Sequence, residues 1–589
     1  MKKSSILRFL TTAALVASVG SLTACTSIDV DTDEGLMKAL VKREKLDKAI
    51  PKISALMSTP EKIAPYIDVL VSLYIDGSGF DREVITALAQ AGDPRADKAF
   101  EKAASSNDTK QVMQAAYGIK KTKNAAIQAT LLKNFDAYIN PEVRRVILDT
   151  GTTIKSEAIA AKAKEILSGN LDETPYSLLR ASCNVLEFQE DPSAASTLIV
   201  SLFHMDGVGH SLTTDCTKAL MALGKDVAEP LLLQAYKLEN KGLNAYVEKH
   251  PNTLTSDTIR NNMANDLALF RSKKAVEPML NFIGDTKTIP IPGTLVIRAA
   301  DDPAWVAWAS LVGAASQASF FALNDIGVRG NEDAKRIFTD IFNWTQPYQD
   351  KFKNAIKLTG TTNIEVSQRV NAFRVLRENG LISTDETLTM INSLKGEEFK
   401  DEKRLRNWAR ASIGTDMVTY IAVTAKAGEL KTLWQAFSDM KTNADGEFFV
   451  PPQESPDTAK VAHFNDNVSK RIDDVRGAFE LAEKCDTQAS CYDKSLSNEN
   501  LTNFERIRIV YELGASGQHD YFETICGIYK SFDMFGQIYA TNALANLGTA
   551  DDIPRIEQLS KDLEREMSQI NYRSAKPNLE NLIFILKNK

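Results

Sequence analysis

The sequence predicts an all-α protein, built as an α–α superhelix of roughly a dozen stacked helix pairs with two irregular insertions. Apolar residues recur at spacings of three and four from about Met37 onward, which indicates amphipathic helices. Gly, Asn, Asp or Pro interrupts this pattern roughly every 15 to 20 residues, so the helices are short and reverse direction. Strand-like alternation is nearly absent. With 43% hydrophobic, 25% charged, 29 Gly and 19 Pro among 589 residues, the composition excludes a disordered or collagen-like chain.

The first 24 residues have the pattern of a secretory signal. Three basic residues precede a short apolar stretch that ends near Val19 and is too short to cross a bilayer as a stable helix. The stretch is followed by Leu-Thr-Ala-Cys at 22–25, which resembles the lipobox of bacterial lipoproteins. The resemblance implies cleavage before Cys25 and a diacylglyceryl group on its sulfur. An ordinary secretory signal with an incidental cysteine is the alternative.

Acylation would tether the protein to a membrane. Two or three acyl chains give stable anchoring, and no later apolar run reaches membrane-spanning length. Thr26 follows the cysteine, and by resemblance to Gram-negative lipoproteins this favours the outer membrane of a bacterial envelope, with either face possible. Residues 25–35 are expected to form an acidic, solvated linker. A net charge of −7 argues against nucleic-acid binding.

Five cysteines remain beside Cys25, and an exported protein can form disulfides. Cys485 and Cys491 are the expected bridge, because the polar residues between them can form a loop. Cys183 and Cys216 occupy similar places in successive repeats, where either a second bridge or two buried thiols is consistent with the sequence. Neither pair has the spacing of a redox or zinc motif.

One helix–turn–helix unit recurs along the chain. Residues 87–100 read ALAQAGDPRADKAF, residues 219–232 read ALMALGKDVAEPLL and residues 543–556 read ALANLGTADDIPRI. In each copy a glycine is expected to end the first helix in the left-handed conformation, and an aspartate to cap the next helix. These residues are Gly92, Gly224 and Gly548, and Asp93, Asp226 and Asp551. Pro94 or Pro554 suits a helix start. The second helix is expected to carry apolar side chains on one face, and these include Phe100, Leu231 and Ile556.

These units resemble HEAT repeats of the compact PBS-lyase HEAT-like kind. The chain as a whole is similar to the HEAT-repeat lipoproteins of predatory and social Gram-negative bacteria, a resemblance that implies scaffolding or binding without a defined activity. The expected solenoid segments are 36–284, 301–443 and 469–589, and the insertions are 285–300 and 444–468.

Both insertions lack helical periodicity and contain prolines. Insertions in solenoids gather on one face and often bind, although a passive surface loop fits equally. Trp305 and Trp308 would share a helix face just after the first insertion, and Phe448 and Phe449 lie in the second. These four aromatic residues are candidate partner anchors, with core packing as the alternative.

No sequence signature of catalysis is present. Phosphate-binding, Rossmann, zinc-protease and serine-hydrolase motifs are all missing. No histidine precedes glutamate, which argues against the paired His-Glu iron sites of some HEAT enzymes. His204, Asp206, His210, Asp215 and Cys216 lie close in sequence but match no zinc spacing. We therefore expect no catalytic residue, metal or cofactor.

The expected function is a scaffold that holds a protein or peptide partner, whose identity the sequence does not give, on its concave face or its projecting loops. The alternatives are an envelope-acting enzyme with paired carboxylates, or a structural element that assembles in the envelope.

Overall fold

The structure is a computed structural model that describes residues 28–56, 59–250, 255–290, 303–359, 363–394, 403–436 and 458–589. Side chains are not described at 60, 303–311, 357–359, 363, 403–412, 415 and 458–471. Within these ranges the chain is helical, without a strand, which confirms the predicted all-α superhelix. It divides into two compact units, Met1–Gln189 and Glu190–Lys589. The division falls inside the solenoid segment expected at 36–284. No described helix has the length and apolar character needed to span a bilayer.

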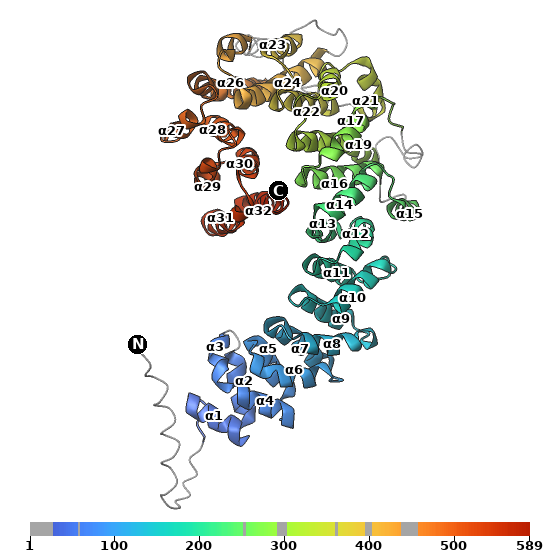
Figure 1. Ribbon diagram of the computed structural model, residues 1–589, viewed down its shortest axis with the longest axis vertical. Helices are drawn as coiled ribbons and strands as arrows, with labels where there is room; N and C mark the ends of the chain where they lie inside the picture. The colour runs from blue at the N-terminus through green and yellow to red at the C-terminus, as the bar shows by residue number, and fades with distance from the viewer. Residues whose placement is uncertain are drawn as a thin grey trace, which may run out of the picture. The chain divides into compact units, whose positions relative to one another are not determined.

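Unit 1 consists of helices stacked in two layers (Figure 1). Helices α5, α7, α9 and α11 contact one another in one layer, and α4, α6, α8 and α10 follow in the other. The helices are α1 (Asp33–Lys42), α2 (Leu46–Ala55), α3 (Pro60–Ile63), α4 (Ile67–Asp76), α5 (Asp81–Ala91), α6 (Asp97–Ala104), α7 (Thr109–Thr122), α8 (Ala125–Lys133), α9 (Pro141–Asp149), α10 (Glu157–Ser168) and α11 (Tyr176–Gln189). The layers meet closely where Phe100 is fully buried against Gly118, which has no Cβ to obstruct the ring.

The turn predicted for the repeat forms as expected in its first copy. Gly92 ends α5 at φ 63°, in the left-handed region. The Asp93 side chain accepts a hydrogen bond from the backbone N–H of Arg95, and Pro94 begins the short 3-10 helix that leads into α6. Phe100 then returns into the core.

The other two copies correct the prediction. Gly224 is the N-cap of α14 (Lys225–Tyr236), with φ 83° and ψ 167°, and Asp226 lies inside that helix. Gly548 is extended, with φ −76°, and Thr549 and Asp552 form the cap that was expected from Asp551. The two turns differ because Gly224 itself is the N-cap of α14 without a side-chain hydrogen bond, whereas Thr549 and Asp552 form a capping box after Gly548. Leu232 is fully buried, in place of the expected Leu231.

The expected acidic linker also needs correction at its end. Helix α1 begins at Asp33, with Thr32 as its N-cap, so residues 33–35 belong to the first turn. Asp31 forms an ion pair with Lys52 at 2.6 Å. The acidic residues favour this helix start because carboxylates interact well with exposed N–H groups there.

Unit 2 also consists of stacked helices, from α12 to α32 (Figure 1). Its helices are α12 (Ala195–Ser201), α13 (Thr213–Ala222), α14, α15 (Lys241–Lys249), α16 (Ser256–Leu269), α17 (Val276–Gly284), α19 (Pro303–Ile326), α20 (Glu332–Phe342), α21 (Gln346–Thr359), α22 (Asn363–Glu378), α23 (Thr384–Ser393), α24 (Lys403–Thr424), α26 (Thr458–Cys485), α27 (Ala489–Ser495), α28 (Asn503–Ala515), α29 (Phe522–Ile528), α30 (Met534–Leu547), α31 (Ile553–Glu566) and α32 (Gln569–Lys587). Because α26 starts at Thr458, the end of the second expected insertion is helical.

The inner helices of unit 2 curl until the end of the unit meets its start. Contacts run from α16 through α19, α22, α24, α28 and α30 to α32, and α32 contacts α16 again. The Phe270 and Phe584 rings meet at 5.0 Å between centroids. Lys218 pairs with Glu580 at 3.3 Å, and the Arg271 guanidinium donates to Asn546 at 2.8 Å.

Side chains fill the inner face that this curl creates. Arg374 of α22 pairs with Glu378 at 3.0 Å, and the Tyr539 hydroxyl of α30 donates to the same carboxylate. The Arg374 guanidinium also lies 5.5 Å from the Tyr420 ring centroid and 5.8 Å from that of Tyr539. The inner face around Arg374 is therefore occupied by the protein's own side chains.

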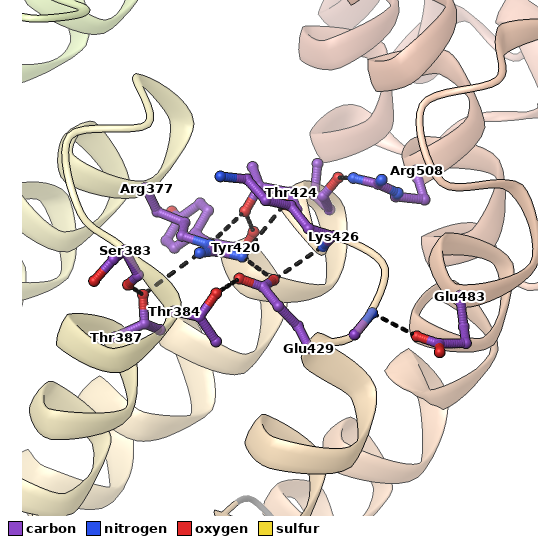
Figure 2. Close-up of polar contacts among 12 residues, drawn as sticks. Arg377, Ser383, Thr384, Thr387, Tyr420, Thr424, Lys426, Glu429, Glu483 and Arg508 are labelled. Carbon is purple, nitrogen blue, oxygen red and sulfur yellow. Dashed lines mark hydrogen bonds and ion pairs between the residues drawn. The ribbon is translucent and has the colours of Figure 1, made fainter.

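A buried polar joint connects α22 and α23 with the turn after α24 (Figure 2). The Arg377 guanidinium donates to the Glu429 carboxylate and also to the Thr424 side chain at 3.1 Å. Glu429 accepts further hydrogen bonds from the Thr384 hydroxyl at 2.6 Å and the Lys426 backbone N–H at 2.9 Å. The joint fixes three successive elements because the partners of the two charges come from α23, from the end of α24 and from the turn that follows it.

The described part of the first insertion, residues 285–290, has neither helix nor strand. It lies against α21: the Ile289 N–H donates to the Lys351 carbonyl at 3.1 Å, and the Asn354 amide donates to the Ile289 carbonyl at 2.8 Å. This attachment holds one wall of the pocket described next.

Candidate binding site

A cavity of 890 Å³ opens in unit 2 between α14, α16, α17, α19, α21 and the 285–290 segment. Its volume is in the range of pockets that hold small ligands or short peptide segments. The lining combines apolar and charged side chains. The charged ones are Lys237, Arg260, Lys274, Lys287 and Lys351, with Glu239, Asp257, Glu277 and Asp285.

Arg260 is a partly buried cation in this pocket, and it has no polar partner among the described residues. It projects from α16 with its Cζ atom 4.5 Å from the ring centroid of Phe282 on α17, a cation–π contact. Throughout the described residues its guanidinium forms no hydrogen bond and no ion pair. By contrast, Lys274 pairs with Glu229 at 2.8 Å. The five N–H donors of Arg260 are therefore available to a ligand.

Lys351 has a structural contact in the same pocket. Only 5% of it is exposed, and its ammonium donates to the Ile283 carbonyl at 3.0 Å, near the C-terminal end of α17. Its Nζ atom also lies 5.7 Å from the Phe282 ring centroid. Burial lowers the pKa of Lys351 to about 8, and the nearby charge of Arg260 acts in the same direction.

Asp257 is the carboxyl nearest to Arg260 along α16, three residues earlier. Burial raises its pKa above the ordinary value, and the charges of Arg260 and Lys351 only partly oppose that rise. The two side chains form no ion pair among the described contacts. Asp257 therefore acts on Arg260 through its charge alone and leaves the N–H donors of Arg260 without an acceptor.

The predicted partner anchors lie outside the described side chains. Trp305 and Trp308 are on the first turns of α19, whose backbone alone is described there. Phe448 and Phe449 fall in the segment 437–457, outside the described residues. Cys25 lies in the segment 1–27, which is also outside them. These five residues stay predictions.

The cysteines are placed in part. Cys485 and Cys491 form the disulfide expected from the sequence, with 5.4 Å between their Cα atoms. Cys526 is a buried free cysteine, and burial raises the pKa of its thiol to about 12. Cys183 and Cys216 are both fully buried, on α11 and α13, which belong to different units.

The His204 to Cys216 segment is an ordered turn. The Asp206 carboxylate accepts from the backbone N–H groups of Val208 at 3.0 Å and His210 at 2.8 Å, and it also pairs with the His210 ring. The buried His204 ring contacts the Tyr246 hydroxyl at 3.1 Å. Within the described ranges, no three His, Cys, Asp or Glu side chains gather in a group that could hold a metal ion.

Sequence reasoning missed both Arg260 and Lys351. A signal for Lys351 exists: it lies on the face of α21 that also carries the buried residues Tyr348, Phe352 and Ala355. A lysine inside an apolar stripe is unusual in a helix that faces a core. Arg260 has no comparable signal, because an unpaired arginine is recognised only from its surroundings in space.

Comparison with known proteins does not assign a family. No family model matches the chain, and no curated protein matches it. One solved structure that it resembles is described as "Homology model of the full-length AP-3 complex in an intermediate open conformation". The resemblance has 12% identity and a TM-score of 0.35, and it covers 91% of this chain and 93% of that one. A likeness at this level carries no argument about function.

Proposed function

We propose that this protein is a binding scaffold, tethered through a lipid on Cys25 in a bacterial envelope, whose pocket beside residues 285–290 holds a peptide segment of a partner protein. One observation carries the proposal. The pocket presents a guanidinium, Arg260, that has no polar partner among the described residues and lies beside apolar walls. Partner binding is then expected at the pocket.

The contacts around the pocket support a role in ligand binding, because they hold its wall in place. The 285–290 segment is attached to α21 by two backbone-directed hydrogen bonds, and Lys351 connects α21 to the end of α17. A wall held in this way is preorganised, so little conformational entropy is lost when a ligand binds.

Crosslinking tests the scaffold. The membrane-anchored protein is mildly crosslinked in cells, and captured proteins are compared between wild type and Asn281→Trp, which places a bulky ring at an exposed position of the pocket lining. Asn107→Trp is the matched control, because Asn107 is exposed in unit 1 and far from the pocket in sequence. We expect one reproducible partner with wild type and the control, and its loss with Asn281→Trp. The scaffold proposal would be contradicted if no partner is captured, or if wild type, Asn281→Trp and Asn107→Trp all capture it equally.

Mass spectrometry of the mature N-terminal peptide tests the anchor separately. We expect a diacylglyceryl mass on Cys25 and residues 1–24 missing, and a Cys25→Ser chain that leaves the membrane fraction. An unmodified terminus would contradict the localisation while leaving the pocket unaffected.

A further inference from the structure

Two cations converge on one aromatic ring inside the pocket. The Arg260 guanidinium lies 4.5 Å and the Lys351 ammonium 5.7 Å from the Phe282 ring centroid. Two positive groups this close repel each other in a partly buried site, and nearby negative charge offsets that repulsion. Asp257 acts on both cations and Asp285 on Lys351 through charge, but neither cation forms an ion pair among the described contacts.

The two cations differ in what they are free to do. Lys351 is buried and donates to the Ile283 carbonyl, so it belongs to the framework. Arg260 is only partly buried and has no acceptor in the described part of the chain. A planar guanidinium in this state matches a carboxylate, which accepts two parallel N–H hydrogen bonds.

The walls around Arg260 indicate which groups of the ligand lie beside the carboxylate. Phe282, Pro278, Ile289, Pro290 and Val312 line the same cavity as Arg260 and provide its apolar surface, with the Phe282 ring against the guanidinium. At 890 Å³ the cavity is much larger than one carboxylate. Its apolar walls fit the side chains that flank an acidic residue in a peptide.

Resting on the function proposed above, we infer that the pocket recognises an acidic peptide segment of the partner. In this arrangement a glutamate or aspartate carboxylate of the partner receives two hydrogen bonds from Arg260. Apolar residues on either side of it pack on the Phe282 and Ile289 walls. Lys351 positions the end of α17 through its hydrogen bond to the Ile283 carbonyl.

Fluorescence anisotropy with the full-length protein in detergent micelles tests this assignment. The probes are two acetylated, amidated and fluorescein-labelled peptides of alanine with a central Phe-Glu-Leu or Phe-Gln-Leu. They differ only in the carboxylate. We expect the glutamate peptide to bind wild type at least about tenfold more tightly, because a charge-assisted contact contributes that much. In Arg260→Gln the two peptides should bind equally.

A labelling measurement on the wild-type protein covers the case in which Arg260→Gln is misfolded. Phenylglyoxal modifies accessible guanidinium groups, and peptide mass spectrometry reads each site. The glutamate peptide should slow labelling at Arg260 several-fold and leave Arg573, which is exposed on α32, unchanged. The glutamine peptide should protect neither residue.

The carboxylate assignment is overturned if neither peptide binds, if both bind wild type equally, or if the difference persists in Arg260→Gln. If such a result is combined with loss of the partner in Asn281→Trp, the scaffold proposal is supported and the acidic-peptide inference is contradicted. If the peptides are discriminated but no partner is captured, the carboxylate assignment would stand and the scaffold proposal would fail.

Discussion

Arg377 and Glu429 form an ion pair whose side chains are only 2% and 3% exposed. Glu429 also accepts from Thr384 and Lys426, and Arg377 also donates to Thr424 (Figure 2). Taking two charges out of water is costly, and each charge here compensates for the burial of the other. The pair is therefore a point where loss of one partner has a larger effect than loss of any exposed pair.

Removal of one charge from this pair should strongly destabilise unit 2. We expect Arg377→Met or Glu429→Gln to lower the free energy of unfolding by about 3–5 kcal/mol, because an uncompensated or unsatisfied buried group stays behind. All five tryptophans lie in unit 2, so their fluorescence during urea unfolding measures this effect.

Arg476→Met is the matched control for that prediction. Arg476 pairs with Glu480 at 2.9 Å, but these side chains are 64% and 55% exposed. Solvent screens such a pair, so its loss should cost below about 1 kcal/mol. Equal losses for Arg377→Met and Arg476→Met would contradict the role assigned to the buried pair.

Asp266 should make unit 2 less stable at high pH. It is 7% exposed on α16, its Oδ2 atom has no hydrogen bond among the described residues, and burial raises its pKa from 3.8 to about 7. The folded state therefore holds this proton more tightly than the unfolded state. Its contribution to stability is fully present below pH 3.8 and is lost as pH rises through about 7.

Asp266→Asn keeps the shape of the side chain without the charge. We expect it to raise the free energy of unfolding at pH 8 by on the order of 4 kcal/mol or less, and with it the urea midpoint, and to change both little near pH 4. Asp226→Asn, at an exposed position, should show no such dependence on pH. A midpoint for Asp266→Asn that shifts equally at both pH values would refute the buried-carboxyl explanation.

Gly118 should not tolerate a methyl group. A Cβ at this position would lie 2.3 Å from the Cζ atom of Phe100, so Gly118→Ala forces the ring to move. Overpacking costs about 1–3 kcal/mol, which offsets or exceeds the helix propensity gained, about 1 kcal/mol. Circular dichroism during thermal unfolding should show a lower midpoint for unit 1.

Gly527 provides the contrasting substitution. A Cβ there meets nothing within 4 Å, and the residue lies in α29. Gly527→Ala should be neutral or stabilise by about 0.4–1 kcal/mol. If both alanine variants changed the midpoint in the same direction and by the same amount, the packing argument at Gly118 would fail.

The Cys485–Cys491 disulfide should hold the middle of α28 in place through Tyr492. The Tyr492 hydroxyl donates to the Asp486 carbonyl at 2.9 Å and accepts from Arg508 of α28 at 2.9 Å. Replacing both cysteines by serine should cost about 2 kcal/mol for a loop this short. Amide hydrogen exchange should rise in α27 and α28 and stay constant in α5. Unchanged exchange in α27 would contradict this.

The sequence by itself determined the helical class and the first repeat turn. Helical periodicity depends on residues three and four apart, and the Gly92, Asp93 and Pro94 turn closes through contacts within a few residues. The Cys485–Cys491 bridge spans only six positions, so loop composition indicated it. In each case the physical partners are neighbours along the chain.

Only the tertiary structure decided which surfaces are free. The return of α32 to α16 depends on residues hundreds of positions apart, such as Lys218 and Glu580. Arg260 of α16 and Phe282 of α17 meet only in the folded unit, and no short-range pattern specifies that meeting. The turns at Gly224 and Gly548 also differ although their sequences are similar, because different residues serve as the N-cap in each.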